Sequence, residues 1–206
     1  ECTKNKIIIY NVENNKLSTK IFGNKFVKNN RDKIKLKIED KEIKLCEGHF
    51  FKSLGENVVE IMEIEPIKEM TGMFENCSSL FSIDTFKNWN TSNVKNAANM
   101  FNGCTSLISI EAVKKWNTGN IKNVCNMFKG CNSLTSIDAL KNWNMSNVIN
   151  ISGMFENCSS IISIDAVKYW NINLMSNMPT NQYNQLIIDI KDHKGKQTGK
   201  RKISSD

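Results

Sequence analysis

One interval governs the middle of this chain: a Met-Phe pair recurs every 27 residues. The pairs begin at Met73, Met100, Met127 and Met154, each 27 residues after the last (100 − 73 = 27). A strict period of this length indicates a supersecondary unit that has been copied and stacked, because 27 residues are too few to bury an apolar face alone. We therefore expect each copy to be covered by the copies before and after it.

Other residue types keep the same step and predict internal columns. The unit reads M-F-x-x-C-x-S-[LI]-x-S-I-[DE]-x-x-K-x-W-N. The columns expected in the core are Phe74, Phe101, Phe128 and Phe155; Cys77, Cys104, Cys131 and Cys158; and Trp89, Trp116, Trp143 and Trp170. A further column is expected to satisfy backbone groups at a bend: Asn96, Asn123, Asn150 and Asn177.

The residues between these columns predict a short strand and a helical turn in each copy. Leu80-Phe81-Ser82-Ile83 is an apolar run typical of a strand, and we expect it to pair in parallel with its equivalents, about 4.8 Å from copy to copy. Asp84 follows and favours an N-cap, so residues 85–89 are expected to form one helical turn. The acidic residues at this position form an acid column: Asp84, Glu111, Asp138 and Asp165. Each precedes a lysine by three residues, which favours solvated local pairs; a carboxylate ladder for a cation is the alternative.

The repeat resembles that of the BspA-like leucine-rich-repeat surface proteins, the DUF285 type. The shared unit is W-N-x-S-N-V-x-N-x-x-x-M-F-x-x-C-x-S-L-x-S-I-D, best preserved from Trp116 to Asp138, and the resemblance covers roughly residues 64–178. The linker is one residue longer than the commonest form, and the last copy departs from the pattern after Trp170. The resemblance implies a solenoid and a binding role, and it implies no catalytic residues.

Together these observations predict an α/β repeat solenoid. It would have leucine-rich-repeat-like coils with short parallel strands and short helical turns, behind a small β-rich N-terminal cap. We expect three regions: a β-rich cap or small domain over residues 1–57, a solenoid with four 27-residue copies over 58–190, and a basic disordered tail over 191–206. Leu186–Ile190 is expected to form a terminal strand.

The first 57 residues differ in style from the repeats. Ile34, Leu36 and Ile38 alternate with lysines, and the alternation resumes after Glu39-Asp40, which predicts a β-hairpin. Val58 to Ile64 is expected to be the first strand of the stack. One interpretation of this region is a cap over the open end of the stack, and the other is an independent β domain with its own partner.

One column is open to a binding role because its residues vary while their neighbours are constant. It consists of Phe81, Ile108, Thr135 and Ile162. Strand alternation should turn some of positions 81, 82 and 84 outward. A variable column on a constant scaffold is where a repeat protein would contact a protein or another macromolecule.

Charge and cysteine spacing argue against several classes of function. Residues 71–180 carry eight basic and six acidic residues, so the repeats lack the clustered positive charge that nucleic-acid binding requires. No run of about 18 apolar residues exists, which predicts no transmembrane segment. Because no C-x-x-C or Cys-His zinc spacing occurs, we predict no metal and no cofactor. An inert thiol ladder is the main interpretation of the cysteine column, with inter-copy disulfides or a redox or metal ladder as alternatives.

The sequence predicts a non-enzymatic repeat scaffold for macromolecular recognition. There is no nucleotide-binding loop, no Ser-His-Asp order and no histidine in the repeats. The resemblance favours a surface or secreted protein that acts in adhesion or protein binding; an intracellular protein-interaction module is the alternative. The sequence starts at Glu1 and shows no leader, so it assigns no compartment, although the resemblance suggests the cell surface or the extracellular space over the cytoplasm. It assigns no oligomeric state.

Overall fold

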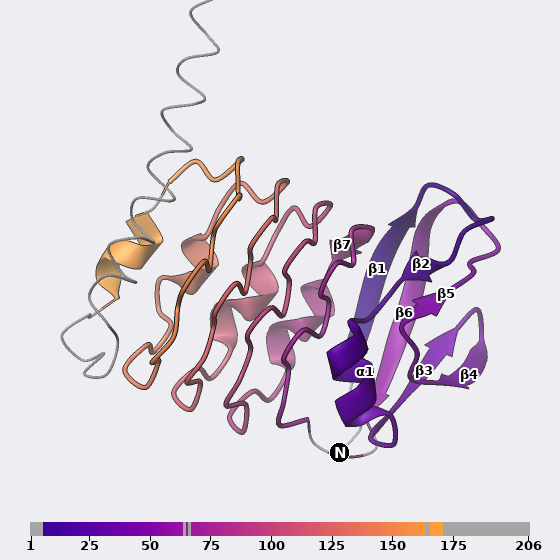
Figure 1. Cartoon of the computed structure of the whole chain (residues 1–206), viewed down its shortest axis with the longest axis horizontal. Coiled ribbons are helices and arrows are strands. Elements are labelled where there is room, and N and C mark those ends of the chain that lie inside the picture. The colour runs from indigo at the N-terminus through magenta and orange to yellow at the C-terminus, as the bar shows by residue number, and fades with distance from the viewer. Residues whose placement is uncertain (1–5, 64, 66, 164, 171–206) are drawn as a thin grey trace, which may run out of the picture.

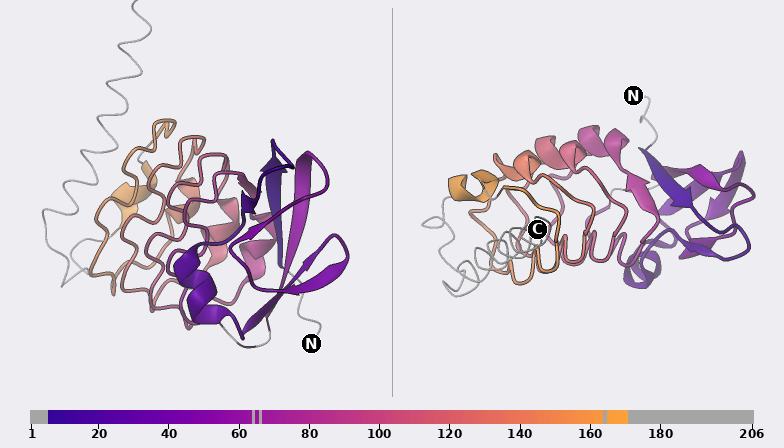
Figure 2. Two further views of the ribbon diagram at one scale, coloured as in Figure 1. Left: turned by 45° about the vertical axis from the view of Figure 1, so that its right-hand side comes forward. Right: turned by 90° about the horizontal axis from the view of Figure 1, so that it is seen from above.

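A computed structural model describes residues 6–170 of this chain, except residues 64, 66 and 164. An antiparallel sheet lies at the N-terminal end, and the repeats follow it side by side along the long axis (Figure 1). Figure 2 shows that short 3-10 helices follow one another along one flank of the repeats. The terminal strand expected at Leu186–Ile190 and the tail expected over 191–206 lie outside the described residues, as does Asn177.

The sheet contains five strands in the order β4-β3-β6-β1-β7 (Figure 1). Its strands are β1 (Lys6–Val12), β3 (Ile34–Ile38), β4 (Lys41–Lys44), β6 (Gly55–Glu63) and β7 (Leu80–Ser82). A second sheet pairs β2 (Thr19–Lys20) with β5 (Gly48–His49), and the described residues form one α-helix, α1 (Asn24–Asn30). The 3-10 helices of the repeats are η1 (Asp84–Asn88), η2 (Glu111–Lys115), η3 (Asp138–Leu140) and η4 (Asp165–Tyr169).

The hairpin predicted around Glu39-Asp40 is present. Strands β3 and β4 pair antiparallel, with Leu36 opposite Ile43. Glu39 and Asp40 have φ angles of 48° and 61°, and two successive left-handed residues are typical of a tight turn whose twist matches the flanking strands. Because β3 alternates, Leu36 is buried and Lys35 points to solvent.

The predicted α/β solenoid with short parallel strands is wrong. Every strand pair in the described part of the chain is antiparallel, and parallel pairing occurs there as isolated bridges such as Asn96–Asn123. The run at Leu80–Ser82 does form a strand, but β7 pairs antiparallel with β1, and residues 107–109 and 134–136 form none. The helical turns of the repeats are 3-10 helices. The described fold is therefore mostly antiparallel sheet with one helix and short 3-10 turns.

The backbone of the repeats explains why no parallel sheet forms between them. Alternate amides of the second copy donate to carbonyls 26 residues ahead: Ala97 to Asn123, Asn99 to Cys125, Phe101 to Met127 and Gly103 to Lys129. The intervening amides of Met100, Asn102 and Cys104 donate three residues back. Each repeat therefore closes tight turns with half of these N–H groups, and the other half bond to the next repeat. A continuous strand would need an extended backbone, which these turns exclude. Turns also bracket the predicted strand of the second copy, since the Leu107 N–H donates to Cys104 O and the Glu111 N–H donates to Ser109 Oγ.

Left-handed residues make these turns possible. Two positions in each copy have φ between 53° and 75°: first Gly72, Asn99, Asn126 and Gly153, then Asn76, Gly103, Gly130 and Asn157. Glycine and asparagine are the residues that adopt this conformation at least cost. A Cβ at Gly103 would also lie 2.6 Å from Asn76 Oδ1 in the preceding copy, but that side chain can move, and Asn76 and Asn157 occupy the same position in other copies. The left-handed backbone is therefore the main constraint at Gly103.

The N-terminal region and the repeats share one hydrophobic core, which extends from Ile8 to Trp170. The Phe22 ring stacks on Phe74 of the first copy at 5.5 Å, and the Gly23 N–H donates to Met73 O at 3.0 Å. Strand β6 pairs with β1 and β3 of the N-terminal region, and the expected boundary between residues 57 and 58 falls inside it.

We predict that Gly103→Ala lowers the free energy of unfolding by about 1–3 kcal/mol, because alanine is strained at a φ of 75°. Urea unfolding followed by circular dichroism measures this change. Gly119→Ala is the matched control, since the nearest atoms to a Cβ there lie at 3.5 Å and its φ is not left-handed. Equal stabilities of the two variants would show that the turn does not need a left-handed residue.

Candidate functional site

The column that the sequence suggested for partner contacts faces solvent. Ile108 is 50% exposed and Ile162 is 68% exposed, Thr135 is exposed and Phe81 is half-buried. The residue before Ile108, Leu107, is fully buried. Thr135 and Ile162 lie side by side, because the Ile162 N–H donates to Thr135 O at 3.0 Å. The same copy-on-copy register that stacks the phenylalanine rings places Phe81 and Ile108 in line with them. The structure therefore assembles these four residues into one surface row.

A serine holds the backbone beside each member of this row. The hydroxyl oxygens of Ser82, Ser109, Ser136 and Ser163 accept the N–H two residues ahead at 3.1–3.3 Å. The first residue of each 3-10 helix is thus the donor of this bond, and the expectation that Asp84 caps the helix is wrong: Ile83 occupies the N-cap, and no side chain caps it. The S-I-D sequence contained the signal for this turn.

The acidic residues that follow these serines by two positions are exposed. Glu111 pairs with Lys114 at 3.6 Å, and both side chains are more than half exposed, so the pair contributes little to stability. No group of three or more His, Cys, Asp or Glu in the described residues is arranged to hold a metal ion. Within the same residues, no helix is long and apolar enough to span a membrane.

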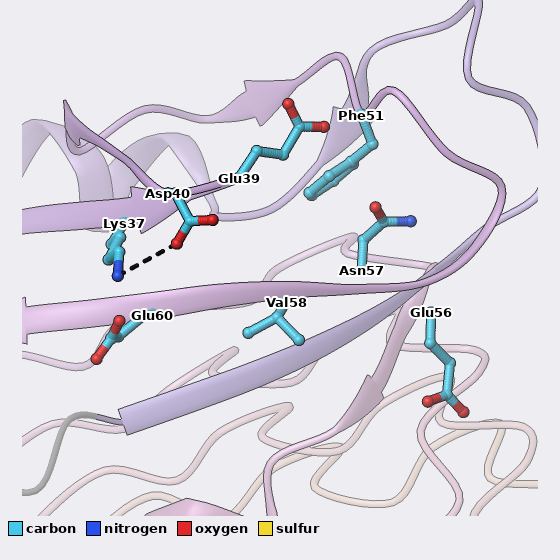
Figure 3. Close-up of a pocket in the computed structure, with 8 residues that line it drawn as sticks. All are labelled: Lys37, Glu39, Asp40, Phe51, Glu56, Asn57, Val58 and Glu60. Atoms are coloured by element: carbon cyan, nitrogen blue, oxygen red, sulfur yellow. Dashed lines mark ion pairs between the residues drawn. The ribbon is translucent and has the colours of Figure 1, made fainter.

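A second surface feature lies at the N-terminal end, where β3 stops short of β6. The β3–β6 pairing ends at Ile38–Val59, so Gly55–Val58 continue past the turn between β3 and β4. A hollow of about 300 Å³ lies there (Figure 3). It is lined by Lys37, Glu39, Asp40, Phe51, Glu56, Asn57, Val58 and Glu60. The sequence interpretation missed this site because it placed residues 58–64 in the stack.

Two carboxylates of the hollow are already paired. Asp40 lies 3.4 Å from the Lys37 ammonium, and Glu39 lies 3.1 Å from that of Lys52 (Figure 3 shows the first pair). The backbone N–H of Lys52 also donates to Glu39, and this hydrogen bond lowers the pKa of the Glu39 carboxyl. Glu56 and Glu60 make no ion pair with any residue that the structure describes.

The expected phenylalanine and tryptophan columns lie in the core. Ring centroids of successive phenylalanines are 5.5, 5.5 and 5.8 Å apart for Phe74, Phe101, Phe128 and Phe155. The tryptophans Trp89, Trp116, Trp143 and Trp170 are 3–6% exposed. Each later indole N–H donates to a carbonyl 30 residues back: Trp116 to Phe86, Trp143 to Val113 and Trp170 to Leu140, at 2.9–3.0 Å. These residues join the copies and are not available to a partner.

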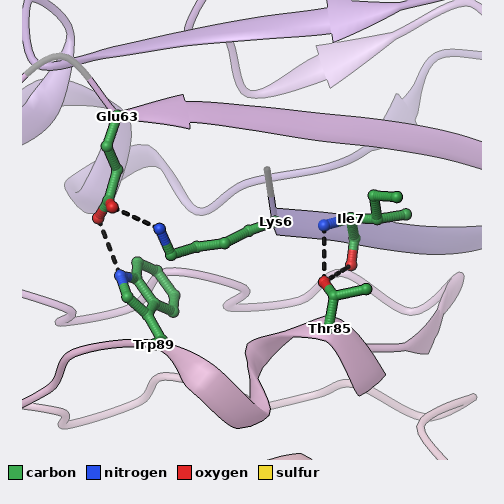
Figure 4. Close-up of polar contacts among 5 residues, drawn as sticks. All are labelled: Lys6, Ile7, Glu63, Thr85 and Trp89. Atoms are coloured by element: carbon green, nitrogen blue, oxygen red, sulfur yellow. Dashed lines mark hydrogen bonds and ion pairs between the residues drawn. The ribbon is translucent and has the colours of Figure 1, made fainter. Parts of the chain in front are cut away.

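The first tryptophan has no preceding copy, and the N-terminal sheet replaces it (Figure 4). Glu63 Oε1 of β6 accepts the Trp89 Nε1–H at 2.9 Å, and the other carboxylate oxygen pairs with Lys6. The Lys6 ammonium also lies 5.1 Å from the centre of the Trp89 ring, within cation–π range. Thr85 of η1 exchanges two hydrogen bonds with the backbone of Ile7, at 2.7 and 2.8 Å.

The cysteine column is a row of free, buried thiols. Three of them donate to the carbonyl 30 residues back: Cys104 to Phe74, Cys131 to Phe101 and Cys158 to Phe128, at 2.8–3.2 Å. Burial raises the pKa of the thiols of Cys77, Cys104, Cys131 and Cys158, to about 12 for Cys158. The thiols therefore remain protonated, which makes them poor nucleophiles and poor metal ligands.

The asparagine column closes a turn in each copy. The side-chain oxygens of Asn96, Asn123 and Asn150 accept the N–H two residues ahead at 2.9–3.1 Å. Isolated parallel bridges connect these residues from copy to copy. They are half-buried and hold the backbone, as an asparagine turn does elsewhere.

Comparison with known proteins identifies one family. Residues 52–189 match the model of the family described as "Mycoplasma protein of unknown function, DUF285", which is about two thirds of the chain. No curated protein and no solved structure matches the chain significantly.

We predict that stability falls with increasing pH through the ladder thiols. A group whose pKa is higher in the folded state stabilises the protein fully below its unfolded pKa, near 9 for a thiol, and loses this effect as the pH rises toward the folded pKa. Above pH 9, each ladder thiol should make the free energy of unfolding fall by up to about 1.4 kcal/mol per pH unit. Urea unfolding between pH 8 and 10 measures the slope.

Cys131→Val should make this slope shallower by one thiol, whereas Cys125→Val, at a half-buried position, should change it less. Identical slopes for the native chain and the Cys131→Val variant would contradict the burial of this thiol.

Proposed function

The chain belongs to the DUF285 family, and we propose that it is a non-enzymatic scaffold that recognises another protein. The contact surface is the exposed row of Phe81, Ile108, Thr135 and Ile162, called the variable row below. The observation that carries this proposal is the exposure of Ile108 and Ile162, 50% and 68%, on repeats whose Phe, Cys and Trp columns are buried. Large aliphatic side chains held in solvent in register favour a binding surface over a purely structural role.

The repeat framework supports this role because it separates specificity from stability. The Phe, Cys and Trp columns hold successive copies together, and none of them reaches the variable row. Substitution in the row changes the chemistry of the surface while the core is left intact. The row is also rigid before a partner arrives, since the serine bonds and the inter-copy bond at Ile162 fix its backbone, and a rigid surface loses little entropy on binding.

The resemblance of the repeat to that of BspA-like surface proteins also favours recognition. We further propose that the partner is a protein that the chain meets at a cell surface or outside the cell. The DUF285 family itself has no assigned function, so membership adds no activity to the proposal. An intracellular interaction module would use the same row and differs in the compartment of its partner.

We predict that a photoreactive benzoylphenylalanine in place of Ile108 or Ile162 crosslinks a discrete protein in the cells that produce the chain. Ile149 is the matched control, because it is 45% exposed and lies about half a repeat from Ile162 (162 − 149 = 13). The double variant Ile108→Ser, Ile162→Ser should compete for the crosslinked protein at least about tenfold more weakly than the native chain, since two apolar contacts are lost.

Ile149→Ser should compete as well as the native chain. If residue 149 crosslinks the same proteins, or if none of the three positions crosslinks a protein, the variable row loses its support as the contact surface.

A further inference from the structure

The outer face of the N-terminal sheet has an apolar strip that remains open to solvent. On β1 and β6, Ile7 lies opposite Glu60 and Ile9 lies opposite Val58. Ile7 is 36% exposed and Val58 is 50% exposed, whereas the next residues along these strands, Ile8 and Val59, are fully buried on the inner face. Strand β1 pairs on its other side with β7, which leads directly into the repeats. Ile7 and Ile9 of the strip therefore lie on β1, and Phe81 of the variable row lies on the neighbouring strand β7.

The hollow beside β6 lies at one end of this strip. Val58 belongs to both features, and the buried ring of Phe51 forms an apolar wall (Figure 3). At about 300 Å³ the hollow is at the small end of the range for small-molecule sites, so one long side chain fits it better than a cofactor does. Asn57 is not free to bind a ligand, because its side chain bonds to Ser53 and Gly55.

The charge of the hollow is negative and unbalanced. Four carboxylates line it, and the ammonium groups of Lys37 and Lys52 pair with two of them, which leaves a net charge of −2 (2 − 4). The remaining pair, Glu56 and Glu60, projects from the same strand on either side of Val58. This charge is local, because residues 1–60 as a whole carry 13 basic and 9 acidic residues. A cationic group is the complement of such a site.

We propose that the hollow binds the lysine or arginine side chain of an extended protein segment that lies along the apolar strip. The aliphatic stem of that side chain packs on Val58 and Phe51, and its charged end lies among the carboxylates that line the hollow, where the net negative charge attracts it. An apolar side chain two residues away on the segment points to the same face and contacts Ile7 and Ile9. The inference rests on the proposed function, because it gives the chemistry of the partner that the variable row also contacts.

The direct test is a titration of the full, ¹⁵N-labelled chain with the extended peptide acetyl-Ile-Ser-Lys-Ser-Ile-amide, followed by NMR. The amides of Glu56, Val58 and Glu60 should shift, and binding should weaken as salt is raised. The same peptide with norleucine in place of lysine keeps the stem and loses the charge. It should bind at least about threefold more weakly, as should the native peptide to the variant Glu56→Gln, Glu60→Gln.

The matched control is the variant Glu111→Gln, Asp138→Asn, which removes the same charge from exposed positions in the repeats and should leave binding unchanged. Equal binding of the lysine and norleucine peptides, or equal binding by the two double variants, overturns the proposal. Self-association of the native chain that Glu56→Gln, Glu60→Gln abolishes would make a second copy the occupant and would also overturn it. If the peptide result is negative while Ile108 still crosslinks its partner, the hollow is eliminated and the proposed function stands.

Discussion

Hydrogen bonds between consecutive copies hold this structure together, and each copy depends on its neighbours to complete them. Half of the amides in the Met-Phe segment donate to the next copy, and the indole of Trp116 and the thiol of Cys104 donate to carbonyls 30 residues back. A buried donor without a partner would cost about 1–3 kcal/mol, so an isolated copy would leave several such costs uncompensated. The packing of the rings, with Phe101 and Phe128 5.5 Å apart, follows from the same register.

The same dependence explains the N-terminal sheet. The first copy needs a substitute for a preceding one, and several unrelated residues supply it. Glu63 accepts the indole N–H that a backbone carbonyl accepts in later copies, and Phe22 continues the row of stacked rings. Gly23 donates to Met73 O, and a Cβ on Gly23 would lie 2.0 Å from Gly72 O, so the two backbones touch. The same sheet turns its outer face to solvent, where the apolar strip and the acidic hollow lie.

The sequence located the columns but not the backbone that connects them. The 27-residue interval was sufficient to place Phe74 above Phe101, because identical copies in register must put like residues together. It failed at Leu80–Ser82, which pairs antiparallel with β1, because the neighbour of the first copy on this side is the N-terminal sheet and not another copy. The glycine and asparagine at left-handed positions such as Asn99 and Gly103 could have predicted the turns. The hollow depends on the relative lengths of β3 and β6, which no local pattern encodes.

Hydrogen exchange of the indole N–H protons, measured by NMR on protein labelled with ¹⁵N-tryptophan, tests the inter-copy bonds most directly. The indole protons of Trp116 and Trp143 donate to the preceding copy in nearly complete burial. They should therefore exchange only through global unfolding, with a protection free energy equal to the unfolding free energy from urea. Exchange as fast as that of an exposed indole, in a chain that is otherwise folded, would contradict the account.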